Sequence, residues 1–483
     1  MPASGERDEV SATEVRSSIT EGGLVRPLFQ LAWPVVVIQL LQVAYNVADT
    51  VWLGRLSADA VGALSLAFPL VFLTISVAGG FTTAGAILVA QHTGAGGEAS
   101  AGRAAGQTVS FVGIVSIALG LVGFVLTDWM LGLLPSSAAT AAQVVPLAGQ
   151  YMSVYFLGMP FLFGFFVFAS LMRGYGDTQT PMRVMAISVA LNVVLDPVLI
   201  FGWFGAPAMG IQGAAIATVF SRGVASAMGF YVLFGTSVGP AISARDLVPD
   251  LSVIADLLRL GIPTSLEQSM SAAAMLSLTA MVVTFAPPVV AAYGLGNRLV
   301  SLVFLPAMGL GQATNTMVGQ NLGARLPDRA ERAVYLAGLT AGGVLLVAAV
   351  VAAAFPQPIV GVFMATGTPE AARTVHFGAE YLRIRSVEFV FIGFMQVLLG
   401  AYRGAGNTKT ALAFSVLTLW IARVPLVYWL SFVVGLGPAG IWWGMAAGNV
   451  IGAIGAGLWF TRGTWKEAVV DVGPRGDVAA AED

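Results

Sequence analysis

Apolar residues fill the chain in long uninterrupted runs. Three segments, 104–127, 129–172 and 197–221, contain no charged residue. A helix needs about 20 apolar residues to cross a bilayer, so each run can hold a membrane-spanning helix. With charged residues and Gly/Pro clusters as boundaries, the pattern predicts twelve such helices, at 27–54, 60–90, 104–126, 144–172, 182–202, 210–235, 254–284, 289–320, 332–354, 377–401, 410–434 and 439–461.

Composition supports this assignment. Hydrophobic residues make up 57% of the 483 positions and charged residues 10%, whereas soluble domains carry about 25% charged residues. No soluble fold could bury this much apolar surface. Cysteine is absent, which excludes disulfides, thiolate metal sites and thiol nucleophiles. Residues 1–26 are rich in acidic side chains and lack a signal-peptide core, so we expect a solvated tail.

The distribution of Lys and Arg predicts the orientation. Basic residues concentrate on the cytoplasmic side of membrane proteins. If both termini are cytoplasmic, sixteen Lys and Arg residues fall in cytoplasmic segments and only Arg55 and Arg373 fall in outer loops. If one helix had been missed, all later segments would change sides and the basic residues would no longer concentrate on one side of the membrane. We therefore expect a multi-pass protein of the cell membrane with both termini in the cytoplasm.

The two halves of the sequence resemble each other. Four landmarks recur in the same order at offsets of 229 or 230 residues: 31–34 with 260–263, 91–95 with 320–324, 173–180 with 403–410, and 210–211 with 440–441. Six helices per copy is an even number, so both copies enter the membrane from the same side, and a substrate path between them is typical of transporters.

We therefore predict an all-α integral membrane protein with two six-helix lobes related by a pseudo-two-fold axis along the membrane normal. The predicted segments are an N-terminal tail (1–26), an amino-terminal lobe (27–236), a cytoplasmic linker (237–253), a carboxy-terminal lobe (254–461) and a C-terminal tail (462–483).

Two carboxyl groups lie inside predicted helices, Asp49 late in the first and Asp196 late in the fifth. An Asp at the centre of a membrane helix costs about 2.5–3.5 kcal/mol, so such residues are usually functional. Asn192 precedes Asp196 by four residues and Asn46 precedes Asp49 by three, which places each amide on the same helix face as its carboxyl. Burial and a second nearby carboxyl both disfavour the charged form, so the pair could hold and release a proton. Alternatively, carboxylate, amide and hydroxyl oxygens could cage Na⁺.

Four motifs identify a family. Residues 173–181 (RGYGDTQTP), 191–197 (LNVVLDP), 45–52 (YNVADTVW) and 210–218 (GIQGAAIAT) resemble the multidrug and toxic compound extrusion (MATE) transporters, in particular their archaeal and DinF-like branch. The resemblance covers roughly residues 27–461. It implies alternating access of two lobes and export of organic cations or drugs in exchange for H⁺ or Na⁺.

The resemblance also implies roles for single residues. Asp49 and Asp196 match the amino-lobe aspartates of that branch, and Asn192, Thr218 and Tyr151 match the polar residues around them. If the coupling ion is Na⁺, the resemblance places it at Asp49, Asp196, Asn192 and Thr218. No other cofactor and no nucleic acid are expected, and we expect a monomer in the lipid bilayer.

The carboxy-terminal half departs from the NorM-like branch of the family, which has a functional glutamate deeper in helix seven and an aspartate in helix ten. Here Glu267, followed by Gln268, lies only four residues after Pro263, and a solvated or capping role is favoured over coupling. Helix ten contains Glu388 but no Asp. Glu388 is as well explained by an ion pair with Arg383 or Arg385 as by coupling. Because of these departures, a sodium site of the NorM-like type is not expected in this half.

Pro34 interrupts the backbone hydrogen bonds of the first helix, and it precedes Asp49 by 15 residues, or about 22 Å of helix. One hypothesis is that ion binding at Asp49 changes the bend of this helix. The alternative, a static kink, explains the sequence equally well.

Other functions fit less well. A flippase for lipid-linked precursors, from the wider superfamily, is the main alternative, but the predicted helices hold few arginines to bind a pyrophosphate. The loop around 176–181 has Gly and Thr but lacks the Walker sequence and a preceding strand, so it does not predict nucleotide binding. Asp177 or Thr178 with Pro181 is better explained as the start of helix five. No enzyme motif such as HExxH or GxSxG occurs.

Overall fold

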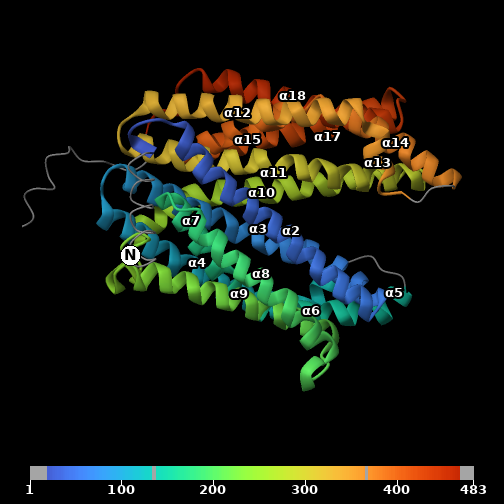
Figure 1. Ribbon diagram of the computed structural model, residues 1–483, viewed down its shortest axis with the longest axis horizontal. Coiled ribbons are helices and arrows are strands. Elements are labelled where there is room, and N and C mark those ends of the chain that lie inside the picture. The colour runs from blue at the N-terminus through green and yellow to red at the C-terminus, as the bar shows by residue number, and fades with distance from the viewer. Residues whose placement is uncertain (1–18, 133–137, 365–367, 468–483) are drawn as a thin grey trace, which may run out of the picture. The chain divides into compact units, whose positions relative to one another are not determined.

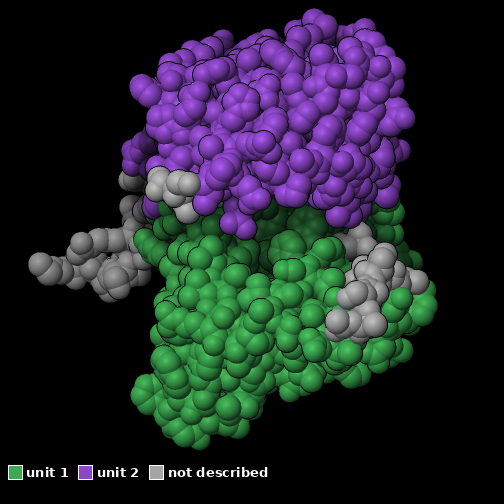
Figure 2. Space-filling model, turned by 90° about the vertical axis from the view of Figure 1, so that its right-hand side faces the viewer, with its two compact units in different colours: residues 1–17, 37–265 green, residues 18–36, 266–483 purple. Residues whose placement is uncertain are grey.

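The computed structural model describes residues 19–132, 138–364 and 368–467, and within these ranges the elements are helices, with no β-strand (Figure 1). The chain forms two compact units, one of residues 1–17 and 37–265 and one of residues 18–36 and 266–483 (Figure 2). We call them unit 1 and unit 2.

Unit 1 holds most of the first half of the chain. Its elements are residues 37–56 of α2 (Val25–Leu56), then α3 (Ala58–Gly94), α4 (Glu98–Gly132), α5 (Ala138–Gln143), α6 (Val145–Leu157), α7 (Met159–Tyr175), α8 (Gln179–Phe201), η1 (Trp203–Gly205), α9 (Gly210–Gly235), η2 (Ala244–Leu247) and residues 251–265 of α10 (Leu251–Val282).

Unit 2 holds residues 25–36 of α2 and 266–282 of α10. The rest of it consists of α11 (Pro287–Gly323), α12 (Pro327–Ala354), α13 (Pro356–Gly361), α14 (Pro369–Ser386), α15 (Phe389–Gly404), α16 (Thr408–Val416), η3 (Leu417–Arg423), α17 (Val424–Tyr428), η4 (Trp429–Val433) and α18 (Pro438–Phe460).

A helix, or a run of consecutive helical segments, lies at each of the twelve predicted positions. Nine described helices are long and apolar enough to cross a membrane, or up to eleven if each of two bent pairs counts as one. The remaining predicted position is that of α10, which is not among them. The chain is thus an all-helical membrane protein of the predicted class, and a count of twelve is consistent with these helices.

Two predicted helices, 144–172 and 377–401, are each broken in two. The axis bends by 54° between α6 and α7 and by 52° between α14 and α15. The first break lies at Gly158 and the second at Val387, which are 229 residues apart and therefore equivalent in the repeat. Pro160 contributes to the first break because it has no N–H to donate to the preceding turn.

The predicted helix 410–434 is also irregular. It contains two π-helical segments, η3 and η4, on either side of α17. Pro425 lies in α17 and removes one backbone donor. A π-helical turn contains more residues than an α-helical turn, and this geometry can accommodate the missing hydrogen-bond donor. Such π-helical turns often occur at functional positions.

The shared Arg-Gly-x-Gly motif has a packing role. A Cβ atom on Gly174 would clash with the carbonyl oxygen of Ala86, and one on Gly404 would clash with that of Asn315. Glycine therefore lets α7 approach α3 closely in unit 1 and α15 approach α11 in unit 2. Small residues serve the same purpose at many membrane helix contacts.

The residues that follow this motif start the next helix. The Asp177 carboxylate accepts hydrogen bonds from the backbone N–H groups of Gln179 (2.8 Å) and Thr180 (3.0 Å). This arrangement satisfies two donors at the beginning of α8. The capping role predicted for this position is confirmed for Asp177.

The predicted linker packs against α4 within unit 1. Gln107 donates to the carbonyl oxygens of Asp246 (2.7 Å) and Val248 (2.6 Å) and accepts from the N–H of Asp250 (2.8 Å). Hydrogen bonds from Ser252 and Arg103 lower the pKa of Asp250 to about 2. Several hydrogen bonds therefore hold the linker against α4 of unit 1.

The end of the predicted N-terminal tail packs against unit 2 at Ile19, whereas residues 21–23 are exposed. Ile19 is fully buried, and Arg329 donates to the carbonyl oxygens of Ile19, Glu21 and Gly22 at 2.8–3.1 Å. Residues 1–18 of this tail, and residues 468–483 of the C-terminal tail, lie outside the described part of the chain.

Two helices are shared between the compact units. The boundary falls after Val36 in α2 and after Ser265 in α10, in each case two residues beyond a proline, Pro34 or Pro263. The compact units thus differ from the predicted lobes, 27–236 and 254–461, at the first helix of each repeat. A proline weakens the helix beside it, so both boundaries coincide with points where bending costs least.

Candidate functional site

The predicted polar residues of the amino-terminal half come together in unit 1. Asp49 lies on α2, Asn192 and Asp196 on α8, and Thr218 on α9, while Tyr151 lies on α6. Asn192 and Asp196 are fully buried, and Asp49 is 5% exposed. Four helices of one compact unit therefore position these five side chains.

The two carboxyl groups are direct neighbours. Asp49 and Asp196 lie within hydrogen-bonding reach of each other, and the side chains of Asn192 and Thr218 also neighbour the Asp49 carboxyl. The Asn192 amide donates to Asp196 Oδ1 at 3.1 Å. This is the i, i+4 contact predicted from the sequence. The carboxyl pair and its polar neighbours therefore come from three helices, α2, α8 and α9.

Four buried oxygen atoms in this cluster have no hydrogen-bond partner among the described residues. They are Asp49 Oδ1, Asn192 Oδ1, Asp196 Oδ2 and Thr218 Oγ1. Buried polar atoms are normally paired, and each exception calls for an explanation. Oxygen atoms are also the ligands that hard cations prefer. Four acceptors in one place, from two carboxyls, an amide and a hydroxyl, can take up a proton or a small metal cation.

Arg222 on α9 lies beside the carboxyl pair, a position that the sequence pattern did not predict. Its guanidinium lies 4.8 Å from the centre of the Tyr45 ring, donates to Gln42 Oε1 at 2.5 Å and contacts the Met185 sulfur at 3.0 Å. It is an electrostatic neighbour of Asp49, but the described residues show no ion pair between them. If both carboxyls are ionised, this single guanidinium leaves the cluster with one excess negative charge.

Aromatic side chains form the apolar surroundings of the cluster. The Tyr151 ring stacks on the Tyr155 ring with centroids 6.0 Å apart, and both rings are largely buried. The Tyr45 hydroxyl donates to the Thr218 carbonyl oxygen at 3.4 Å. These rings restrict water around Asp49 and Asp196, which strengthens the interaction of the carboxyls with any cation.

Asn46, the other predicted partner of Asp49, is exposed and accepts a hydrogen bond from Gln42 at 3.4 Å. It is not one of the four unpartnered oxygens. Pro34 lies inside α2 and is buried, within the part of this helix that belongs to unit 2. The structure thus gathers five of the predicted residues and leaves Asn46 and Pro34 outside the cluster.

Glu267 has a different environment from the one expected. It is 3% exposed, so the expectation of a solvated role is wrong. Its carboxylate accepts from Arg403 Nη2 (2.5 Å) and Nε (3.2 Å) and from the Ser415 hydroxyl (2.8 Å). These contacts join α10, α15 and α16 within unit 2. Gln268, the next residue, is half-buried.

Glu388 forms an ion pair with Arg385, which was one of the two alternatives for this residue. Both side chains are buried. The second carboxylate oxygen of Glu388 accepts from the Asn449 amide at 2.8 Å, and Arg385 also donates to the Tyr381 hydroxyl at 3.2 Å. Each of the two carboxylate oxygens of Glu388 therefore already has a partner. All of these residues belong to unit 2.

Comparison with known proteins finds relatives that cover most of the chain. The model of the MatE family matches the chain twice, at residues 34–198 and 263–429. The probable multidrug resistance protein YpnP of Bacillus subtilis is 30% identical over 448 residues, which cover 92% of this chain and 97% of that protein.

Two solved structures have the same fold. A crystal structure of MATE in the straight conformation has a TM-score of 0.84 at 25% identity, with 93% of this chain and 98% of that chain covered. A crystal structure of MATE in the bent conformation has a TM-score of 0.85 at 24% identity, covering 96% and 98%. The double match of the family model, 229 residues apart at its two starts, coincides with the internal repeat. The chain is a member of the MatE family, a multi-pass membrane transporter and not an enzyme.

Proposed function

We propose that this protein exports organic cations and other drugs in exchange for H⁺ or Na⁺, by alternating access of its two repeats. The relatives' names, as multidrug resistance proteins, supply the substrate class. The proposal places the transporter in the cell membrane as a monomer with both termini in the cytoplasm, as the distribution of Lys and Arg predicts.

The observation that carries the proposal is the set of four unpartnered oxygens around Asp49 and Asp196. A proton shared by the two carboxyls would remove the repulsion between them and neutralise the excess negative charge. Na⁺ would do the same with Asp49, Asp196, Asn192 and Thr218 as ligands. Either ion is bound when the site is closed and dry, and it is released when water enters and stabilises both carboxylates.

Transport in membrane vesicles tests this function directly. We expect the purified protein, in vesicles, to move ethidium against its gradient when a pH gradient or a Na⁺ gradient is imposed. Dissipation of the driving gradient with an ionophore should stop transport, and the gradient that supports it identifies the coupling ion. Failure of both gradients would contradict the proposal and favour the flippase alternative.

Pro34 supplies a second test. Because α2 is shared between the two units, this helix must change its bend when one repeat moves. The lack of an N–H in Pro34 removes one backbone hydrogen bond from this helix, two residues before the helix passes from unit 2 to unit 1. Related MATE structures are described as straight and bent. In Pro34→Ala the restored hydrogen bond should stiffen α2, and we expect ethidium efflux to fall about tenfold, a barrier change of about 1.4 kcal/mol.

The matched control is Pro69→Ala, which removes an exposed proline inside α3, a helix that lies within one unit. It should transport at the wild-type rate. Equal efflux by wild type and Pro34→Ala would show that this proline is a static kink.

A further inference from the structure

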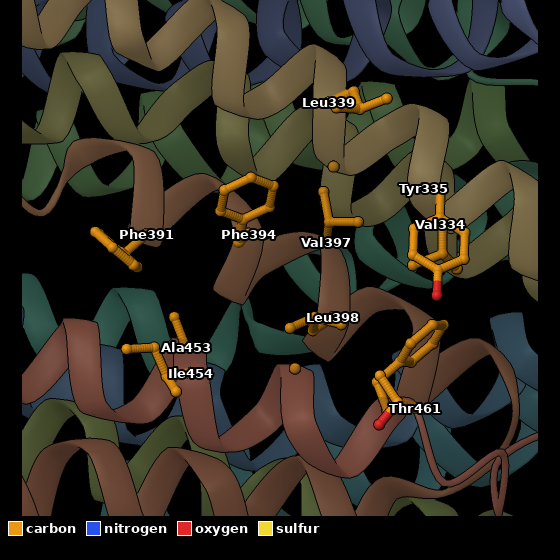
Figure 3. Close-up of a pocket in the computed structure, with 13 residues that line it drawn as sticks. Val334, Tyr335, Leu339, Phe391, Phe394, Val397, Leu398, Ala453, Ile454 and Thr461 are labelled. Carbon is orange, nitrogen blue, oxygen red and sulfur yellow. The ribbon is translucent and has the colours of Figure 1, made fainter.

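Unit 2 carries an apolar groove that the proposed transport cycle does not use. It lies between α12, α15 and α18 and has a volume of about 340 Å³ (Figure 3), within the range of small-molecule sites. Its lining includes Leu339, Phe394, Leu398 and Ile454. All of its lining residues belong to unit 2, so the groove is complete within one compact unit.

Two glycines create much of the room. A Cβ atom on Gly457 would meet only Leu398 Cδ1, at 3.9 Å, and one on Gly338 would meet the Phe394 ring at 3.5 Å. Neither position is crowded by backbone, so close helix packing does not require these glycines. Both glycines line the groove, so a longer side chain at either position would occupy part of it.

One end of the groove is polar. Tyr335 and Thr461 are the only lining residues with polar side-chain atoms, and Figure 3 shows their oxygens at the same end, away from Phe391 and Ile454. The Tyr335 ring packs edge-on against Phe460, with centroids 6.2 Å apart. This end lies at the start of α12 and the end of α18, which the charge pattern predicts to be cytoplasmic.

Two arginines are close in sequence to the residues of this polar end. Arg332 lies one turn before Tyr335 on α12, and Arg462 follows Thr461 and lies over the Trp459 ring at 4.5 Å. Both are exposed, and the described part of the chain shows no ion pair for either. The neighbouring carboxylates of Glu331 and Asp328 lie 2.7 and 3.9 Å from Lys466 instead.

The surrounding charge is positive overall. Segments 325–335 and 459–467 together carry five basic and three acidic residues. Trp459 accompanies them, and tryptophan is common where a helix meets the membrane surface. Basic pockets between helices on the cytoplasmic side bind the headgroups of anionic lipids.

We propose that this groove binds one acyl chain of an anionic phospholipid, whose net negative headgroup charge is balanced by Arg332 and Arg462. The apolar groove sets the depth of the chain, and the Tyr335 and Thr461 hydroxyls lie where the chain meets the headgroup. The site accounts for two exposed arginines that form no ion pair among the described residues, and for two glycines that close packing does not require.

Lipid binding to the purified full-length protein tests the proposal. Native mass spectrometry would compare phosphatidylglycerol with phosphatidylcholine of the same acyl chains. We expect phosphatidylglycerol to bind about 30-fold more tightly, as two basic contacts supply. The double variant Arg332→Gln/Arg462→Gln should lose this preference and keep its binding of phosphatidylcholine. Gly457→Leu, which occupies part of the groove, should weaken the binding of both lipids.

Matched controls separate these effects from general ones. Arg373→Gln removes an exposed arginine at the start of α14, and Gly343→Leu adds the same side chain at an exposed glycine of α12 with open space around it. Both should bind lipid as the wild type does. Equal affinity of the wild type for the two lipids, an unchanged preference in the double arginine variant, or displacement of the lipid by glycerol phosphate alone would each overturn the proposal.

Discussion

Replacing Asp49 by asparagine is expected to lower ion-driven ethidium efflux by at least about 100-fold, equivalent to about 2.7 kcal/mol of lost coupling. Asparagine has nearly the same shape and still fits among Asp196, Asn192 and Thr218. The asparagine amide has no acidic proton to release, and it supplies no negative charge to Na⁺. Efflux from vesicles under the gradient that drives the wild type measures this loss.

Asp196→Asn should show the same loss of efflux, because the two carboxyls bind the coupling ion together. Residues that act as one unit are not additive, so the double variant should be no worse than either single variant. Asp128→Asn, which neutralises an exposed carboxyl on α4 of the same unit, is the control and should transport normally. Full activity in both site variants would rule out the carboxyl pair as the coupling site.

The sequence was sufficient to locate the helices, because hydropathy depends on each segment alone and membrane-spanning segments must satisfy their backbone hydrogen bonds internally. It was not sufficient to locate the breaks. The break at Gly158 has a local signal in Pro160, but no proline lies at its counterpart, Val387. That second break adjoins the Arg385–Glu388 pair, a contact that depends on the tertiary structure.

The candidate site shows the same limit. Asp49 and Asp196 stood out because a carboxyl is costly inside a membrane helix, and the Asn192 contact followed from helix geometry. Arg222 was visible as an arginine in the sixth predicted helix, but its position beside Tyr45 and Gln42 depends on how α2 and α9 pack. Glu267 was misjudged for a similar reason, since its partners Arg403 and Ser415 are more than 130 residues away.

Glu388→Gln is expected to destabilise unit 2 by about 3 kcal/mol, because it leaves the buried Arg385 guanidinium without its counter-charge. Arg423 lies in the same electrostatic environment as Arg385 and Glu388, and its Nε atom has no hydrogen-bond partner among the described residues. The Arg385 and Arg423 guanidiniums would then repel each other with no carboxylate to offset their charges. The melting temperature of the purified protein should fall by about 10 °C, measured by tryptophan fluorescence.

Adding Arg385→Met to Glu388→Gln separates a structural role from a coupling role. The methionine removes the unpaired charge while it fills much of the same space, and the amide oxygen introduced at position 388 can still accept from Asn449. Replacement of a whole buried ion pair by neutral groups is often neutral or stabilising. We therefore expect the double variant to recover most of the lost melting temperature. We also expect it to export ethidium as the wild type does. If Glu388 instead carried the coupling ion, Glu388→Gln would abolish efflux at an unchanged melting temperature, and the second substitution would restore nothing.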